Sequence, residues 1–165
     1  MVAQALAVLH PSEVSRLILA ATQSGTGNAL PVPRAAAKAV NSSNPAQTLS
    51  VLFPPGQSAA KAAYVKGILN YPGYYQASDA VKTLQNAALA QWLAGRQPAG
   101  RNVTDLRLPT LVADGTNDAL DPVRNDRMLA SLIRGAQLAL YPDAGHAFWF
   151  QDEAQFVARI DRFLR

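Results

Sequence analysis

The sequence predicts an α/β fold in which parallel strands are flanked by helices. Short apolar runs at about residues 16–21, 110–114 and 137–141 have the length and composition of strands buried in a sheet. In the last third of the chain, apolar residues at helical spacing follow each of the two later runs. An order of strand, helix, strand, helix is typical of parallel strands joined by right-handed crossovers.

The composition is that of a single globular unit. The chain has 165 residues, of which 49% are hydrophobic and 16% are charged, so it can bury a core of its own. The net charge is +4, but the basic residues are scattered and form no run of the kind that binds nucleic acid. Cys is absent and only two His occur, so we expect no disulfide, no metal site and no cofactor.

The N-terminal residues do not resemble a targeting signal. Residues 1–9 are apolar, but they carry no basic region and no small-residue cleavage site before His10-Pro11. No apolar stretch approaches the roughly 20 residues that a membrane-spanning helix requires. We therefore expect a soluble, cytoplasmic protein with neither a membrane nor a nucleic acid as its partner.

The first elements are a helix over residues 1–9 and the strand at 16–21. Val2, Ala5, Leu6 and Leu9 recur at helical spacing, and no N-cap precedes them because the sequence begins there. The following strand is continuously apolar, which predicts burial on both of its faces. We interpret His10 as a surface residue at the helix end, without a functional role.

Residues 24–101 predict a helical insertion, because Gly, Pro, Ser and Asn separate Ala- and Leu-rich segments and nothing alternates with a period of two. Helices are predicted at about 33–40, 45–53, 58–69 and 78–93. Asn44 is expected to cap the second of these. One face of the longest helix collects Ala80, Val81, Leu84, Ala88 and Trp92. We interpret Tyr71, Tyr74 and Tyr75 as packing residues within the insertion.

The last third contains two predicted helices. Asp121 is expected to cap the first of them ahead of Pro122, and Gly135 to end it. Its inward residues are expected to be Leu129, Leu132 and Ile133. The closing helix begins at Asp152-Glu153, and its apolar stripe consists of Phe156, Val157, Ile160, Phe163 and Leu164.

Polar clusters follow both late strands. Residues 114–118 read Asp-Gly-Thr-Asn-Asp, and residues 143–146 read Asp-Ala-Gly-His. Because the carboxyl ends of parallel strands line one crevice, we expect Asp118 to lie beside His146. The carboxylate would fix the tautomer of the imidazole and stabilise its protonated form. Asp114 is the competing carboxylate, but it lies at the strand end before the glycine turn.

These clusters resemble the α/β-hydrolase fold family. Residues 111–122 are similar to its penultimate strand and acid loop, and residues 141–148 to its final strand and histidine loop. The resemblance implies that Asp118 is the acid and His146 the general base of a catalytic triad. It also implies that residues 1–23 and 102–165 form the C-terminal part of the hydrolase core. Residues 24–101 would then form a helical lid.

The family's nucleophile has no counterpart in these 165 residues. In that family a Ser in a G-x-S-x-G turn precedes the acid and the histidine, just ahead of the helix with which this sequence opens. No G-x-S-x-G occurs here, because the run Ser24-Gly25-Thr26-Gly27 lacks the leading glycine and follows the wrong strand. The loop that would supply half of the oxyanion hole is also absent. We therefore expect an esterase-like serine hydrolase that is inactive alone, whether as a truncation, a split protein or a degenerate gene product.

The substrate and the partner remain open at this stage. Esterases, haloperoxidase-like enzymes and carbon–carbon hydrolases share the layout, and an ester or another acyl compound is the expected substrate class. Phe148 and Trp149 are candidate substrate contacts, although aromatic residues beside a final strand more often belong to the core. The alternative function is a non-catalytic, small-molecule-binding or self-associating module. In either case an unpaired apolar edge at strand 16–21 predicts a homo-oligomer or a complex with a missing N-terminal half.

Overall fold

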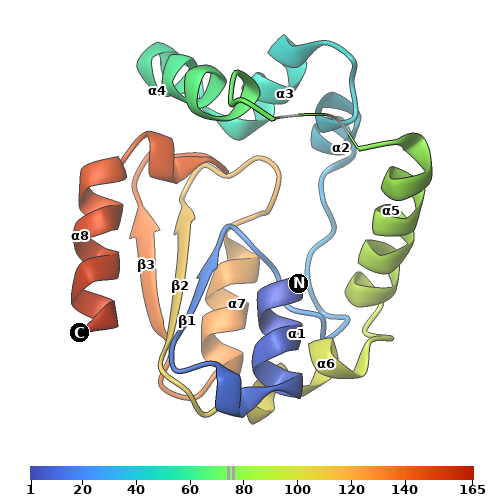
Figure 1. The fold of residues 1–165 in the computed structure, drawn as a ribbon, viewed down its shortest axis with the longest axis vertical. Helices are drawn as coiled ribbons and strands as arrows, with labels where there is room; N and C mark the ends of the chain where they lie inside the picture. The colour runs from blue at the N-terminus through green and yellow to red at the C-terminus, as the bar shows by residue number, and fades with distance from the viewer. Residues whose placement is uncertain (74, 76) are drawn as a thin grey trace.

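The computed structural model describes residues 1–73, 75 and 77–165, which form a three-stranded parallel sheet flanked by helices (Figure 1). The strands are β1 (Leu17–Ala20), β2 (Thr110–Gly115) and β3 (Gln137–Tyr141), in the order β1-β2-β3. Ile18 pairs with Leu111, and Val112 pairs with Leu138. The α/β class and the parallel strands that the sequence predicts are therefore confirmed.

Helices precede, connect and follow the strands. The chain opens with α1 (Val2–Leu9) and the short turn η1 (Pro11–Glu13), and His10 between them is an exposed residue. Between β1 and β2 lie α2 (Arg34–Val40), α3 (Pro45–Leu52), α4 (Ser58–Tyr64), η2 (Val65–Leu69), α5 (Asp79–Leu93), α6 (Pro98–Arg101) and η3 (Asn102–Asp105). The last elements are α7 (Arg124–Leu132), η4 (Phe148–Phe150) and α8 (Glu153–Leu164).

The two faces of the sheet carry separate apolar clusters. On one face α1 and α7 pack against the strands through Ala7, Leu19, Val112, Leu129 and Ile133, all of which are buried. On the other face α8 and η4 cover the sheet through Ala113, Tyr141, Phe148 and Phe156. Burying both faces in this way orders the strands and brings their carboxyl ends to one edge.

Residues 24–101, called the inserted segment below, run over the carboxyl ends of the strands and along one side of the molecule (Figure 1). The predicted helices form, and α3 and α5 have side-chain caps. The side chain of Asn44 accepts the N–H of Ala46 at 3.0 Å, and the side chain of Ser78 caps α5. A separate lid domain stays a prediction.

The apolar face that the sequence predicts on α5 forms, but most of it is exposed. Trp92 is buried, but Val81 and Leu84 are exposed. The physical reason is that helical spacing identifies an apolar face without specifying what covers it, and the N-terminal turns of α5 do not pack on the sheet. The stripe of α8 is also narrower than expected, because Val157 and Leu164 are about half exposed.

The tyrosine cluster does not pack as predicted. Tyr71 and Tyr75 are exposed, so they are surface residues of the loop before α5. Tyr74 lies outside the described residues. Among the described residues, no helix combines the length and the apolar character needed to cross a bilayer.

Candidate active site

The site lies where the chain leaves β2 and β3. The two loops are joined by their backbones, since Thr116 N–H donates to Tyr141 O at 2.9 Å and Asn117 N–H donates to Ala144 O at 2.8 Å. Gly115 lies where the two loops come closest to each other, and a Cβ atom there would overlap the backbone carbonyl of Ala144. The parallel register therefore brings the acid loop and the histidine loop into direct contact.

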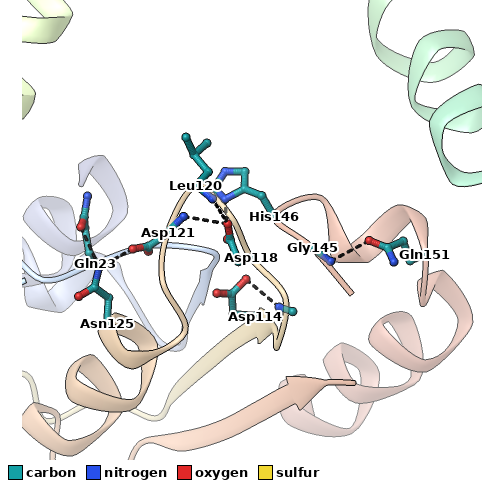
Figure 2. A network of polar contacts seen from close by, with 10 residues as sticks. Gln23, Asp114, Asp118, Leu120, Asp121, Asn125, Gly145, His146 and Gln151 are labelled. Carbon is teal, nitrogen blue, oxygen red and sulfur yellow. Dashed lines mark hydrogen bonds and ion pairs between the residues drawn. The ribbon is translucent and has the colours of Figure 1, made fainter. Parts of the chain in front are cut away.

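Asp118 and His146 form the pair that the sequence predicts (Figure 2). The distance from His146 Nδ1 to Asp118 Oδ2 is 2.7 Å, and Asp118 Oδ1 accepts the N–H groups of Leu120 at 2.6 Å and Asp121 at 2.8 Å. The carboxylate is fully buried, whereas the His146 side chain is 22% exposed. With Nδ1–H directed at the carboxylate, a neutral imidazole has its acceptor lone pair on Nε2.

The inserted segment supports the histidine loop from the opposite side. Ala147 N–H donates to Leu52 O at 3.1 Å, and a Cβ atom on Gly145 would meet Leu52 O at 2.7 Å. Gly145 N–H donates to the side chain of Gln151 at 2.9 Å. The end of α3 therefore requires glycine at 145, the residue that immediately precedes His146.

A cavity of about 530 Å³ opens beside the imidazole. His146 and Leu120 form part of its wall, and the inserted segment adds Val40, Leu89 and Leu93 from α2 and α5. Most of this lining is apolar, so the cavity suits an uncharged organic group. Its position brings such a group next to the exposed part of His146.

Asp114, the competing carboxylate, is not the partner of His146. Its side chain is fully buried, accepts the N–H of Gly115 at 2.7 Å, and faces Asp126 of α7. Burial raises the pKa of Asp114 strongly, and the facing carboxyl of Asp126 raises it further. At neutral pH Asp114 therefore holds a proton. Burial also raises the pKa of Asp126.

The prediction that Asp121 caps a helix is wrong. Helix α7 begins at Arg124, and its cap position is Val123, which makes no side-chain capping bond. Asp121 Oδ1 instead accepts a hydrogen bond from Asn125 Nδ2 at 2.6 Å. Burial raises the pKa of Asp121 to about 6, and the bond from Asn125 opposes this rise. Pro122 and Val123 lie outside the helix, and the Asp121 side chain bonds to Asn125 in place of a backbone N–H of the first turn.

Neither Phe148 nor Trp149 lines the cavity that contains His146. Phe148 is fully buried and stacks on Tyr141, with ring centroids 4.8 Å apart, and it also packs edge-to-face on Phe156. The turn η4 directs this side chain under β3 because three aromatic rings can close the core there. Trp149 lies half-buried against Phe148. Their role as substrate contacts stays a prediction that this cavity does not support.

Sequence reasoning missed two buried polar residues, Gln23 and Asn125. Asn125 is fully buried, and its Nδ2 lies 3.1 Å from Gln23 Oε1 (Figure 2). Gln4 of α1 donates to the backbone O of Gln23 at 3.0 Å. For Asn125 the available signal was a polar residue within a predicted helix, but that signal does not identify a partner about 100 residues away. Among the described residues, no group of three or more His, Cys, Asp or Glu side chains could hold a metal ion.

Comparisons with known proteins agree with this architecture. No protein-family model matches the sequence. The chain is 27% identical to a 2-hydroxymuconate semialdehyde hydrolase from a Pseudomonas strain, over 99% of this chain and 58% of that protein. Among solved structures, an α/β-hydrolase fold protein from Chitinophaga pinensis superposes with a TM-score of 0.75 at 22% identity, over 98% of this chain and 60% of the other.

A thermophilic esterase from Thermogutta terrifontis is a further structural neighbour, with a TM-score of 0.63 at 22% identity. This match covers 99% of the present chain and 60% of the esterase. The chain thus spans about three fifths of the length of the proteins that it matches along nearly all of its own length. It has the α/β-hydrolase fold, of which it represents the C-terminal part.

Proposed function

We propose that this chain supplies the acid and the general base of a serine hydrolase, and that a nucleophile outside these 165 residues completes the triad. The observation that carries the proposal is the 2.7 Å contact between His146 Nδ1 and Asp118 Oδ2 beside an apolar cavity. A buried carboxylate that fixes the tautomer of a partly exposed imidazole is the arrangement a triad requires. No G-x-S-x-G turn occurs in the sequence.

In the proposed reaction, a serine hydroxyl attacks the substrate carbonyl while His146 Nε2 accepts the hydroxyl proton. Asp118 stabilises the resulting imidazolium and keeps the ring in place. His146 then gives the proton to the leaving group. In the second step water attacks the acyl-serine carbonyl while His146 accepts its proton, and the proton passes to the serine oxygen as the acyl group is released. Oxyanion donors would come from the same polypeptide as the serine.

The proposed substrate is an ester or a related acyl compound with an apolar group that fits the cavity of about 530 Å³. One relative is a 2-hydroxymuconate semialdehyde hydrolase and one structural neighbour is an esterase. Esterase, carbon–carbon hydrolase and haloperoxidase-like chemistry therefore all remain candidates. An apolar wall discriminates weakly among small acyl groups, so the residues that line the cavity do not distinguish these three reactions.

The test compares the 165-residue chain with the same chain extended by the coding sequence directly upstream of Met1. Both proteins are treated with a fluorophosphonate probe and with a p-nitrophenyl ester. We expect labelling and turnover only in the extended protein, on a serine of the added segment. Turnover should fall by about 10⁴-fold in the His146→Ala variant. Robust labelling of the 165-residue chain alone would contradict the proposal.

A second candidate function, association without catalysis, is favoured by exposed apolar surface on the β1 side. Strand β1 is an edge of the sheet, and α1 leaves Val2 82%, Leu6 44% and Leu9 62% exposed. Unpaired strand edges and contiguous apolar patches recruit other chains. In this alternative a second copy or an N-terminal half covers β1 and α1. Light scattering that shows a folded monomer at high concentration would exclude self-association.

A further inference from the structure

We propose that Asn125 is a positioning residue that couples the beginning of the inserted segment to the Asp118–His146 pair. The proposal rests on the proposed function, because it assigns Asn125 a role in placing the acid and the base. Asn125 touches neither of them directly. It lies in the first turn of α7, close to the acid loop, and its side chain is completely buried.

The first half of the coupling joins Asn125 to Leu30, which lies 95 positions earlier in the sequence. Asn125 Oδ1 accepts the N–H of Leu30 at 2.7 Å, and Asn125 Nδ2 donates to the carbonyl of Leu30 at 3.0 Å. The side-chain amide therefore satisfies both backbone groups of one residue. Leu30 belongs to the loop that leads from β1 into α2, so this pairing anchors the beginning of the inserted segment to α7.

The second half joins Asn125 to the acid. Asn125 Nδ2 donates to Asp121 Oδ1 at 2.6 Å, and the N–H of Asp121 donates to Asp118 Oδ1 at 2.8 Å. Asp118 Oδ2 in turn contacts His146. A continuous series of short hydrogen bonds thus leads from Leu30 to the imidazole, and Figure 2 shows the part of it that runs from Asn125 through Asp121 and Asp118 to His146.

Only an amide side chain meets these requirements at position 125. The N–H of Leu30 requires an acceptor, whereas the carbonyl of Leu30 and the carboxylate of Asp121 require donors. A carboxylate would face Asp121 without a donor, and an apolar side chain of similar size would leave the backbone of Leu30 unpaired. A buried amide is costly unless its groups are bonded, and here both Oδ1 and Nδ2 are.

The coupling has a consequence for the site. The inserted segment supplies Val40, Leu89 and Leu93 to the cavity wall. A ligand in the cavity that displaces the beginning of this segment would therefore displace Leu30 as well. Through Asn125, that movement reaches the backbone turn which holds Asp118. The orientation of His146 then depends on how the inserted segment is seated, although the segment makes no hydrogen bond to the imidazole among the described residues.

The test uses the Asn125→Asp variant of the whole chain and follows the Nδ1 proton of His146 by NMR. Above the pKa of the new carboxyl pair, two carboxylates repel each other, and the Nδ1 proton should exchange with solvent about tenfold faster than in wild type. At about pH 5 the pair holds a proton that restores the donor toward Asp121, so the exchange rate should return to within about twofold of wild type. Faster exchange that is confined to the His146 Nδ1 proton, with the backbone amides of the sheet exchanging at the wild-type rate, is the readout that a purely structural role would not produce.

The matched control is Asn102→Asp, a chemically identical change at an exposed residue that does not line the cavity. Its Nδ1 proton should exchange at the wild-type rate at both pH values. An unchanged rate in Asn125→Asp, or a fast rate that low pH does not reverse, would overturn the positioning role. Neither result bears on the serine-dependent turnover that tests the proposed function, so the two proposals fail separately.

Discussion

The carboxyl ends of the strands and the β1 side of this molecule differ in their contacts. At the strand ends the polar groups are hydrogen-bonded within the chain, whereas in the described part of the chain the β1 side leaves an edge strand unpaired and apolar side chains exposed. At the strand ends, Asp118 receives two backbone N–H groups as well as the imidazole of His146. On the β1 side, the edge strand has no further neighbour among the described residues, and α1 directs Val2 and Leu6 to solvent. The chain thus builds its acid–histidine pair from internal contacts alone.

This difference separates two kinds of dependence. The geometry of the pair depends on the register of β2 and β3 and on the loops that follow them. Any chemistry depends in addition on what covers β1 and α1. Changes at the strand ends should therefore disturb the pair in the isolated chain, whereas changes on α1 should affect association and leave the pair intact.

The largest effect is expected for Gly115→Ala. The added methyl group would overlap the backbone carbonyl of Ala144, so the acid and histidine loops would have to separate. Overpacking against backbone is costly, and we expect a loss of about 3 kcal/mol in the free energy of unfolding together with loss of the His146 Nδ1 signal. Urea unfolding and NMR measure the two quantities.

A suitable control is Gly67→Ala. A Cβ atom at Gly67 would meet only the ring of Phe150, at 3.7 Å, and the residue lies in helical backbone. Because Ala favours helix over Gly by about 1 kcal/mol, this variant should be as stable as wild type or more stable. Equal losses in the two glycine variants would show that the loops are not in the close contact described.

The next effect is expected for Asp118→Ala. Removal of the carboxylate leaves the N–H groups of Leu120 and Asp121 without their acceptor, which should cost about 2 kcal/mol in the free energy of unfolding. Asp118→Asn retains an acceptor and should cost less. Chemical denaturation of both variants checks this order. If Asn were as destabilising as Ala, the backbone bonds to Oδ1 would not be the main stabilising contribution.

Local patterns were sufficient to predict the elements that place the site. The apolar runs located all three strands, and the strand-end positions of Asp118 and His146 predicted their contact, since parallel strands end at one edge. The cap at Asn44 was also predictable because its bond is local. In each of these cases the information lies within a few residues of the structure that it determines.

The failures concern contacts between distant segments. The spacing predicted one apolar face on α5, but it carries no information on what covers that face, and Leu84 is exposed. Asp121 was misassigned because its partner is the side chain of Asn125, not the backbone of the next helix. The role of Asn125 itself depends on Leu30, whose position becomes known only when the inserted segment is in place.

An effect seen as a pH dependence of stability is expected for Asp114→Asn. Burial raises the pKa of Asp114 in the folded state, so the folded chain binds a proton that the unfolded chain has released. Stability is then highest below about pH 4 for this group and falls as the pH rises, by at most about 1.4 kcal/mol per pH unit. Asn removes this slope, except for the part that Asp126 contributes. Urea unfolding of both proteins between neutral and alkaline pH measures it; parallel slopes would contradict a protonated Asp114.

The smallest effect on folding, and the most specific for the β1 side, is expected for Val2→Ser. Val2 is 82% exposed, so the free energy of unfolding should change by less than about 0.5 kcal/mol. Self-association measured by light scattering should nevertheless weaken, because the exposed apolar surface of α1 is reduced. Val157→Ser on α8 makes the same change at a residue that is 50% exposed on the other face of the sheet. If both substitutions weaken association equally, general hydrophobicity and not the α1 surface drives it, and the contrast between the two regions fails.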